Sequence, residues 1–294
     1  MLAPMAAELS AETLWVYGVY EDSEGVHGWY DADKNGNNDS ALCWAAVSSN
    51  LINWWQDQYV TPAGVPTGEA VWSTYRSSAN NTMANTQIGV EWWLTGDGYS
   101  LYELFYGVSF FKNTTNGGYY TRYENDPDAI YYDGKYVYHV EDNSARNLAA
   151  TIYTALNTEQ GRIGIGVNVG SSPSSTYHGI TLWGAEFADD LTLTALYLTD
   201  SDDATVNAAG DLDLFKVNVR YENYNGTEYL YLEDYWNTGA RYVESLTLFD
   251  ATQTDAWGME RQSLAMRSLI VPEPATATLS IMALAALAFR RRRS

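Results

Sequence analysis

The chain has 294 residues, enough for one large domain or two small ones, and 46% of them are hydrophobic, which allows a sizeable core and argues against global disorder. Its formal net charge is -21. This acidity argues against a nucleic-acid partner, because a protein that holds phosphate groups needs a basic face. It favours solubility and suits an extracellular protein.

The N-terminal residues 1–11 lack the basic start and the long apolar run of a complete signal peptide. Residues 2–7 are small or apolar, as at the end of such a peptide. We therefore predict that residues 1–11 are a signal-peptide remnant or a disordered N-terminus, and that the natural start lies upstream.

A possible calcium loop follows. The segment from Asp31 to Gly36 reads DADKNG, the first half of an EF-hand pattern, and Asp39 takes the ninth position. Leu42 stands at the twelfth position, where a bidentate glutamate belongs, and no helical pattern precedes the loop. The segment is predicted to be a polar turn, with a calcium site as the alternative.

The first predicted helix covers residues 43–58. Its apolar residues recur at helical spacing: Cys43, Val47, Leu51 and Trp54. Asp39 or Ser40 could cap it by accepting from the free N–H groups of the first turn. Cys43 is the only cysteine, so it forms no intramolecular disulfide. Its thiol is either a small buried hydrophobic group or a catalytic nucleophile.

Residues 101–138 are rich in tyrosine among glycine and asparagine. We interpret them as an aromatic insert packed on the body. The alternative is a platform for a substrate or glycan, since amphipathic rings offer contact area at low entropy cost.

A second helix is predicted over residues 144–159, with Gly161 as its stop. Alternating and β-branched runs then predict strands at residues 163–169, 177–183, 191–199, 214–221, 228–233, 242–249 and 264–271. Asn225-Gly226 is a strong hairpin signal between two of them. Helix first and mostly antiparallel sheet afterwards is an α+β layout.

A chemical site is predicted where three of these elements meet. A helix N-terminus and a nearby imidazolium both lower a thiol pKa, and Cys43 has the first of these by position. His178 begins one predicted strand and Asp200 ends the next, so adjacent antiparallel strands could bring Asp200 to orient and stabilise the imidazole. The pattern favours acyl transfer by Cys43. The alternative is that His178 and Asp200 are ordinary structural residues.

The C-terminus reads VPEP from Val271, then a small apolar run over residues 275–289, then four arginines from Arg290. About 22 Å of helix at 1.5 Å per residue is short for a full membrane span, and the arginines mark its cytoplasmic side. This order resembles the PEP-CTERM sorting signal. The resemblance implies export, transient membrane anchoring by this helix, and processing by an exosortase; an ordinary tail anchor is the alternative.

Two blocks of the body carry a second resemblance. The first comprises GWYD from Gly28, then Lys34, LCWAA around Cys43 and NWW from Asn53. The second comprises HGITLWGAEF from His178 and YLTDSD from Tyr197. In this order they resemble the catalytic segments of the IdeS/Mac immunoglobulin-degrading cysteine endopeptidases, which are papain-like. The similarity spans about residues 28–257.

The resemblance implies roles for the matching residues. Cys43 corresponds to the nucleophile, His178 to the general base and Asp200 to the residue that orients it. Asp202 corresponds to a second supporting carboxylate. Lys34 corresponds to a lysine that joins the Cys43 N–H in the oxyanion hole, where a fixed cation stabilises developing negative charge. The segment before Cys43 is slightly shorter than in the family, and residues 101–138 do not match, so immunoglobulin as substrate is not implied.

The predicted protein is therefore an α+β, papain-like cysteine endopeptidase, secreted or displayed on the cell surface. Residues 12–270 form the peptidase domain and residues 271–294 the sorting signal. Its partners are a protein substrate and an exosortase-type enzyme, and no cofactor or metal is expected. The alternatives are a non-catalytic surface binding protein on the same scaffold, or a transglutaminase or amidase with the same triad.

Overall fold

The computed structural model describes residues 12–36, 38–96, 107–112, 117–124, 136–140, 144–158, 161–173, 175–202, 214–235 and 241–262. The predicted N-terminal remnant, most of the tyrosine-rich segment, the predicted strand at 264–271 and the sorting tail lie outside these ranges. The division of the chain into three segments therefore stays a prediction. None of the helices within these ranges has the length and apolar character needed to cross a membrane, and the predicted apolar helix at 275–289 falls outside them.

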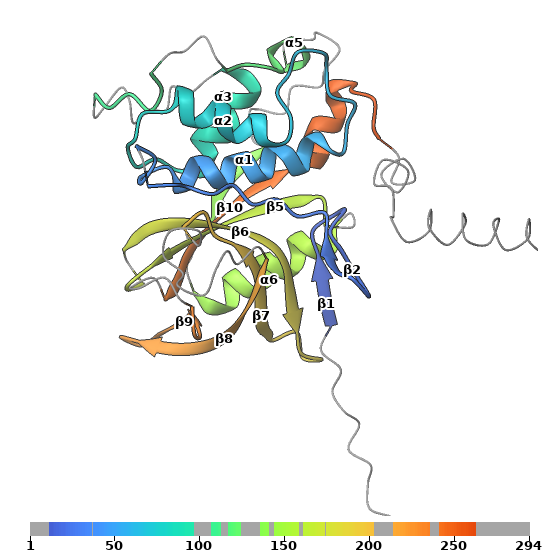
Figure 1. Ribbon diagram of the computed structural model, residues 1–294. Helices are drawn as coiled ribbons and strands as arrows, with labels where there is room; N and C mark the ends of the chain where they lie inside the picture. The colour runs from blue at the N-terminus through green and yellow to red at the C-terminus, as the bar shows by residue number, and fades with distance from the viewer. Residues whose placement is uncertain are drawn as a thin grey trace, which may run out of the picture.

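The described residues form a helical layer and a sheet layer (Figure 1). The helical layer contains α1 (Cys43–Gln56), α2 (Glu69–Ser78), α3 (Thr86–Thr95), the short α5 (Thr121–Glu124) and the 3-10 helix η2 (Ala251–Trp257). Helix α1 lies between the other helices and the sheet, and it contacts α2 and α3 on one side and β5 and β6 on the other. Helix α6 (Ala145–Asn157) lies with the strands and contacts β5 and β9.

Among the described residues, eight strands form one antiparallel sheet: β1 (Glu12–Trp15), β4 (Val137–Val140), β5 (Ile163–Gly170), β6 (Thr176–Phe187), β7 (Leu193–Thr199), β8 (Phe215–Tyr224), β9 (Thr227–Leu232) and β10 (Tyr242–Asp250). The pairing order β6-β5-β10-β9-β8-β7 returns to β6, so these strands close into a barrel. Strands β1 and β4 extend it from β6 and β10. A separate hairpin joins β2 (Tyr20–Asp22) to β3 (Gly25–His27).

Glycines on the sheet allow α1 to lie directly against it. A Cβ atom at Gly164 would come within 2.8 Å of the Leu51 and Trp54 side chains, and one at Gly166 within 3.0 Å of Val47. The helix therefore fills the space that a side chain would need at these two positions on β5. The close contact buries nearly the whole of α1, and it sets the height of the helix above the sheet and hence of Cys43.

The predicted α+β layout is confirmed, and the order of helix and strands follows the sequence pattern. The helix predicted at 43–58 is α1, the helix predicted at 144–159 is α6, and the strands predicted between residues 163 and 249 are β5 to β10. Helices α2 and α3 and strands β1 to β4 were not predicted. Helix α3 is buried almost throughout, so it shows no polar face, and the strands β1 to β4 are each no longer than four residues.

A buried arginine ties the barrel to the helical layer. Arg162, which is 5% exposed, lies 2.8 Å from the Asp255 carboxylate in η2 and also donates to Gln58 Oε1 and Tyr59 Oη. Replacing Arg162 with methionine should lower the free energy of unfolding by about 3 kcal/mol, because the buried acceptors lose their donor. Urea unfolding followed by circular dichroism measures this difference.

The matched control is Arg146→Met. Arg146 is 91% exposed and lies 3.8 Å from Glu228, so removing its charge should change the free energy of unfolding by less than about 0.5 kcal/mol. Equal effects of the two substitutions would contradict the structural role of Arg162.

Candidate active site

Cys43 is the first residue of α1, as predicted. Its backbone N–H is therefore one of those that a helix leaves without an internal acceptor, and its side chain lies at the positive end of the helix dipole. The side chain is partly exposed. A thiolate at this position is stabilised by the helix and can be reached from solvent.

The predicted side-chain cap of this helix is wrong. The N-cap residue is Leu42, and no side chain caps the first turn. The Asp39 carboxylate instead accepts from Asn35 N–H at 3.1 Å and pairs with Arg76 at 3.2 Å, while Ser40 uses its carbonyl oxygen to accept from Lys34. An uncapped first turn leaves the helix dipole to act on Cys43.

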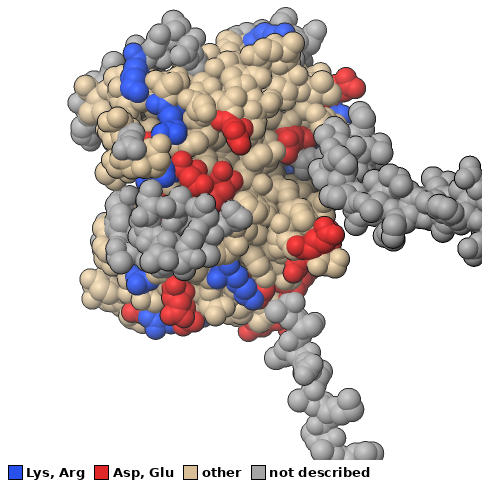
Figure 2. All heavy atoms as spheres, viewed as in Figure 1, with Lys and Arg blue, Asp and Glu red and all other residues tan. Residues whose placement is uncertain are grey.

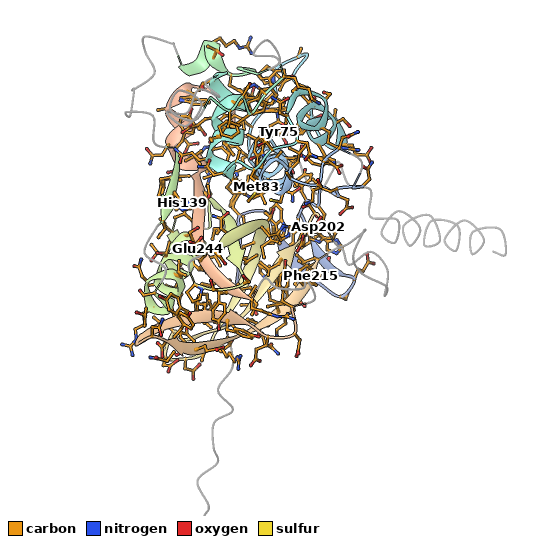
Figure 3. The ribbon with its side chains drawn as sticks, turned by 90° about the vertical axis from the view of Figure 1, so that its left-hand side faces the viewer. Tyr75, Met83, His139, Asp202, Phe215 and Glu244 are labelled. Carbon is orange, nitrogen blue, oxygen red and sulfur yellow. The ribbon has the colours of Figure 1, made fainter. Side chains whose placement is uncertain are left out.

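Strand β6 carries His178 past the start of α1. Gly179 shows how close the two elements are, since a Cβ atom there would lie 3.9 Å from the carbonyl carbon of Cys43. His178 is 4% exposed, and it acts on the Cys43 thiol closely enough to lower the pKa of that thiol. The other two histidines lie elsewhere: His27 pairs with Asp22 on the β2–β3 hairpin, and His139 lies on β4, away from Asp202 (Figure 3).

Asp200 follows the last residue of β7 and meets His178 from the neighbouring strand, as predicted. Its Oδ1 atom lies 2.7 Å from His178 Nε2 and also accepts the Asp202 N–H at 2.9 Å. The preceding residue, Thr199, is held by the Trp183 indole N–H and donates to the Tyr30 carbonyl oxygen. These bonds fix the end of β7 and therefore the position of the carboxylate.

Lys34 and Asp202 form a second charged pair beside the histidine. The Lys34 ammonium lies 2.8 Å from Asp202 Oδ1, and the other carboxylate oxygen lies 3.6 Å from His178 Nδ1. Lys34 is 3% exposed, and its backbone N–H donates to the Ser201 carbonyl oxygen. The structure thus brings all five predicted site residues together.

The site lies where the helical layer meets the barrel. Figure 3 places Asp202 at this boundary, with Met83 on the helical side and Phe215 on the barrel side. Acidic side chains gather near the same boundary on the face shown in Figure 2. The segment that resembles half of an EF-hand loop runs here too. This segment places Lys34 beside Asp202. Asp39, at the ninth position of the loop pattern, is paired with Arg76.

The electrostatics of the site favour a thiolate and an imidazolium. Burial acts to raise the pKa of Cys43, but the hydrogen bond and charge of His178 and the charge of Lys34 outweigh it, and the pKa is lowered. Burial alone would lower the pKa of His178, whereas Asp200, with a further contribution from Cys43, raises it to about 10. Burial acts to raise the pKa of Asp200, but His178 and the hydrogen-bond donors hold it below its usual value.

His178, Asp200 and Asp202 also satisfy one geometric condition of a metal site, since one ligand atom from each lies within 4.8 Å of the others. The carboxylates already have partners, however. A Lys34 ammonium 2.8 Å from Asp202 repels a cation bound at the same group, and Asp200 accepts from three donors. The arrangement fits an imidazolium with two carboxylates better than it fits a metal ion.

One residue at the site was missed. The Tyr235 hydroxyl, just after β9, donates to Asp200 Oδ2. No signal marks it in a chain with 24 tyrosines. Its position beside Asp200 depends on the pairing of β7 with β8 and of β8 with β9, because Asp200 follows β7 and Tyr235 follows β9.

Comparison with known proteins agrees with both resemblances read from the sequence. Residues 12–64, which include Lys34 and Cys43, match the family described as Mac 1, and residues 271–294 match the PEP-CTERM protein-sorting motif. The IgM protease of Streptococcus suis (strain P1/7) is 27% identical over 214 residues, covering 61% of this chain and 18% of that protein. The chain thus spans less than a fifth of that relative's length. The matches confirm the resemblance to IdeS/Mac proteins with a PEP-CTERM motif.

Proposed function

We propose that this protein is an exported cysteine endopeptidase with a papain-like active site, in which Cys43 is the nucleophile, His178 the acid and base, and Asp200 the residue that orients it. The observation that carries the proposal is the meeting of three residues distant in sequence: a partly exposed thiol at a helix N-terminus, and a buried histidine that lowers the pKa of this thiol and lies 2.7 Å from a buried aspartate. A structural cysteine needs none of these partners.

The geometry supports a two-step acyl transfer. The Cys43 thiolate attacks the carbonyl carbon of a peptide bond, and the oxyanion is stabilised by the Cys43 N–H and the Lys34 ammonium. His178 then gives its proton to the leaving amine, and a thioester on Cys43 remains. A water molecule, deprotonated by His178, attacks the thioester, and the thiolate and the free carboxyl product result.

Lys34 and Asp202 act together in this proposal. The salt bridge to Asp202 and the bond to the Ser40 carbonyl oxygen hold the ammonium in one position before substrate arrives. A cation fixed in advance stabilises the transition state without the cost of reorganisation. The charge of the Lys34 ammonium also helps to lower the pKa of Cys43.

We propose that the substrate is a protein. The relative from Streptococcus suis is named as a protease, and this name supports the proposal. We propose that the C-terminal motif directs export, that the apolar run at 275–289 anchors the chain transiently, and that an exosortase-type enzyme processes it at the motif. Cleavage would then take place outside the cell.

The test combines cleavage with thiol chemistry. The full chain is incubated with a complex protein mixture and the new N-termini are sequenced, with and without earlier treatment of the chain with iodoacetamide at pH 5.5. Because the pKa of Cys43 is lowered and that of His178 is raised to about 10, the thiolate persists at a lower pH than an ordinary thiolate does. We expect complete alkylation at pH 5.5, and new N-termini only in the untreated sample.

Other outcomes would identify the alternatives. Cleavage that continues after complete alkylation would rule out Cys43 as the nucleophile. Isopeptide-linked products in place of new N-termini would indicate a transglutaminase. If the thiol reacts only at alkaline pH and no new products form, the result would favour a non-catalytic binding protein.

A further inference from the structure

The Asp200 carboxylate is held by hydrogen bonds on both oxygens. Oδ1 faces His178 Nε2 at 2.7 Å and accepts the Asp202 N–H at 2.9 Å, and Oδ2 accepts from the Tyr235 hydroxyl. Asp200 has no measurable exposure and Tyr235 is 1% exposed. With three donors and no solvent, the carboxylate has one favourable orientation.

We infer that Tyr235 is a positioning residue for the active site: its hydroxyl fixes the rotation of the Asp200 carboxylate so that Oδ1 faces His178. This inference rests on the proposed function. It adds to the site a residue that the spacing of the catalytic residues in the sequence does not indicate. Tyr235 acts through Asp200 and does not touch the reacting atoms.

Two further contacts hold the tyrosine itself. Its ring stacks on Phe215 of β8, with centroids 6.2 Å apart and planes inclined by 21°. Its carbonyl oxygen accepts from the Arg241 guanidinium, and the Arg241 backbone N–H donates to Gly170 at the end of β5. Gly170 pairs with Thr176, two residues before His178. Arg241 therefore links Tyr235 to the end of β5, which pairs with the start of the strand that carries His178.

The charged surroundings determine how loss of the hydroxyl would appear in a titration. Asp200 is faced by the ring of His178, which lies on β6, and by the hydroxyl of Tyr235, which lies in the segment after β9. His178 in turn faces Cys43 from α1 and the Asp202 carboxylate, which carries the Lys34 ammonium. The Tyr235 hydrogen bond lowers the pKa of Asp200. Without it, the carboxylate takes up a proton at a higher pH and stops stabilising the imidazolium there.

The experiment compares Tyr235→Phe with Tyr242→Phe in the full chain. Tyr242 on β10 also donates to a carboxylate, that of Glu222 at 3.0 Å, but belongs to no part of the site. The rate of Cys43 alkylation by iodoacetamide is measured against pH. We expect the acidic limb for Tyr235→Phe to move up by about one pH unit, so that the rate on that limb falls about tenfold. The Tyr242→Phe profile should superimpose on that of the unmodified chain.

A second background separates positioning from a purely structural effect. If Tyr235 acts through Asp200, the Tyr235→Phe substitution should cause no further shift in a chain that already carries Asp200→Asn. Should Tyr235→Phe fail to fold, Phe215→Leu gives a second test, because it removes the ring on which Tyr235 stacks and so loosens the hold of the tyrosine on the Asp200 carboxylate. An upward shift of the acidic limb supports the inference, and an unchanged profile overturns it.

Failure of this inference differs from failure of the proposed function. A Tyr235→Phe profile identical to that of Tyr242→Phe, while the unmodified chain still shows an acid-shifted thiolate, would overturn the role of Tyr235 alone. An unmodified chain whose cysteine reacts as an ordinary thiol would overturn both.

Discussion

Replacing Cys43 with alanine is expected to abolish peptide-bond cleavage, with a fall in kcat of at least about 10⁴-fold, because no other group can form the acyl intermediate. The chain has no second cysteine that could substitute. The measurement is the appearance of new N-termini in the substrate identified by the cleavage experiment, at equal concentrations of the two chains.

The fold should survive this substitution. Cys43 is only partly buried, so the free energy of unfolding should change by less than about 1 kcal/mol. The thiolate contributes to the raised pKa of His178, so that pKa should fall below about 10 in the alanine variant, which NMR of the imidazole can follow. Cys43→Ser is the conservative control and should also be inactive, because a serine hydroxyl at this position does not ionise. An alanine variant that cleaves at the normal rate would disprove the assignment of the nucleophile.

Replacing Lys34 with methionine is expected to lower kcat by about 10²- to 10³-fold, the usual cost of removing one group that stabilises an oxyanion. KM should change little, because the ammonium acts on charge that develops only in the transition state. The same substitution should move the acidic limb of Cys43 alkylation to higher pH, since the charge of Lys34 helps to lower that pKa.

Lys216→Met is the matched control for Lys34→Met. Lys216 on β8 also pairs with a carboxylate, 2.6 Å from Glu186 Oε1, but it is 43% exposed and is not part of the site. Its loss should leave kcat and the alkylation profile unchanged. If Lys34→Met lowers activity only in proportion to a loss of folded protein, measured by circular dichroism at the assay temperature, the oxyanion role is refuted.

The local chemistry of the site could be predicted because short-range patterns determine it. Helical spacing after residue 42 places Cys43 at a helix start, and strand patterns place His178 and Asp200 on neighbouring antiparallel strands. The resemblance to the IdeS/Mac family supplied Lys34 and Asp202. The capping prediction failed, because Asp39 finds a stronger partner in Arg76, a residue of α2 that no local pattern connects with it.

The sequence by itself therefore determined the α+β class, the thiol at the start of a helix and the order of thiol, imidazole and carboxylate along the chain. Only the tertiary structure decided the closure of the barrel, the packing of α1 against Gly164 and Gly166, and the contact of Tyr235 with Asp200. The physical reason is range: periodicity records which face of an element is buried, whereas the pairing of a hydroxyl with a carboxylate 35 residues away depends on how every strand between them is registered.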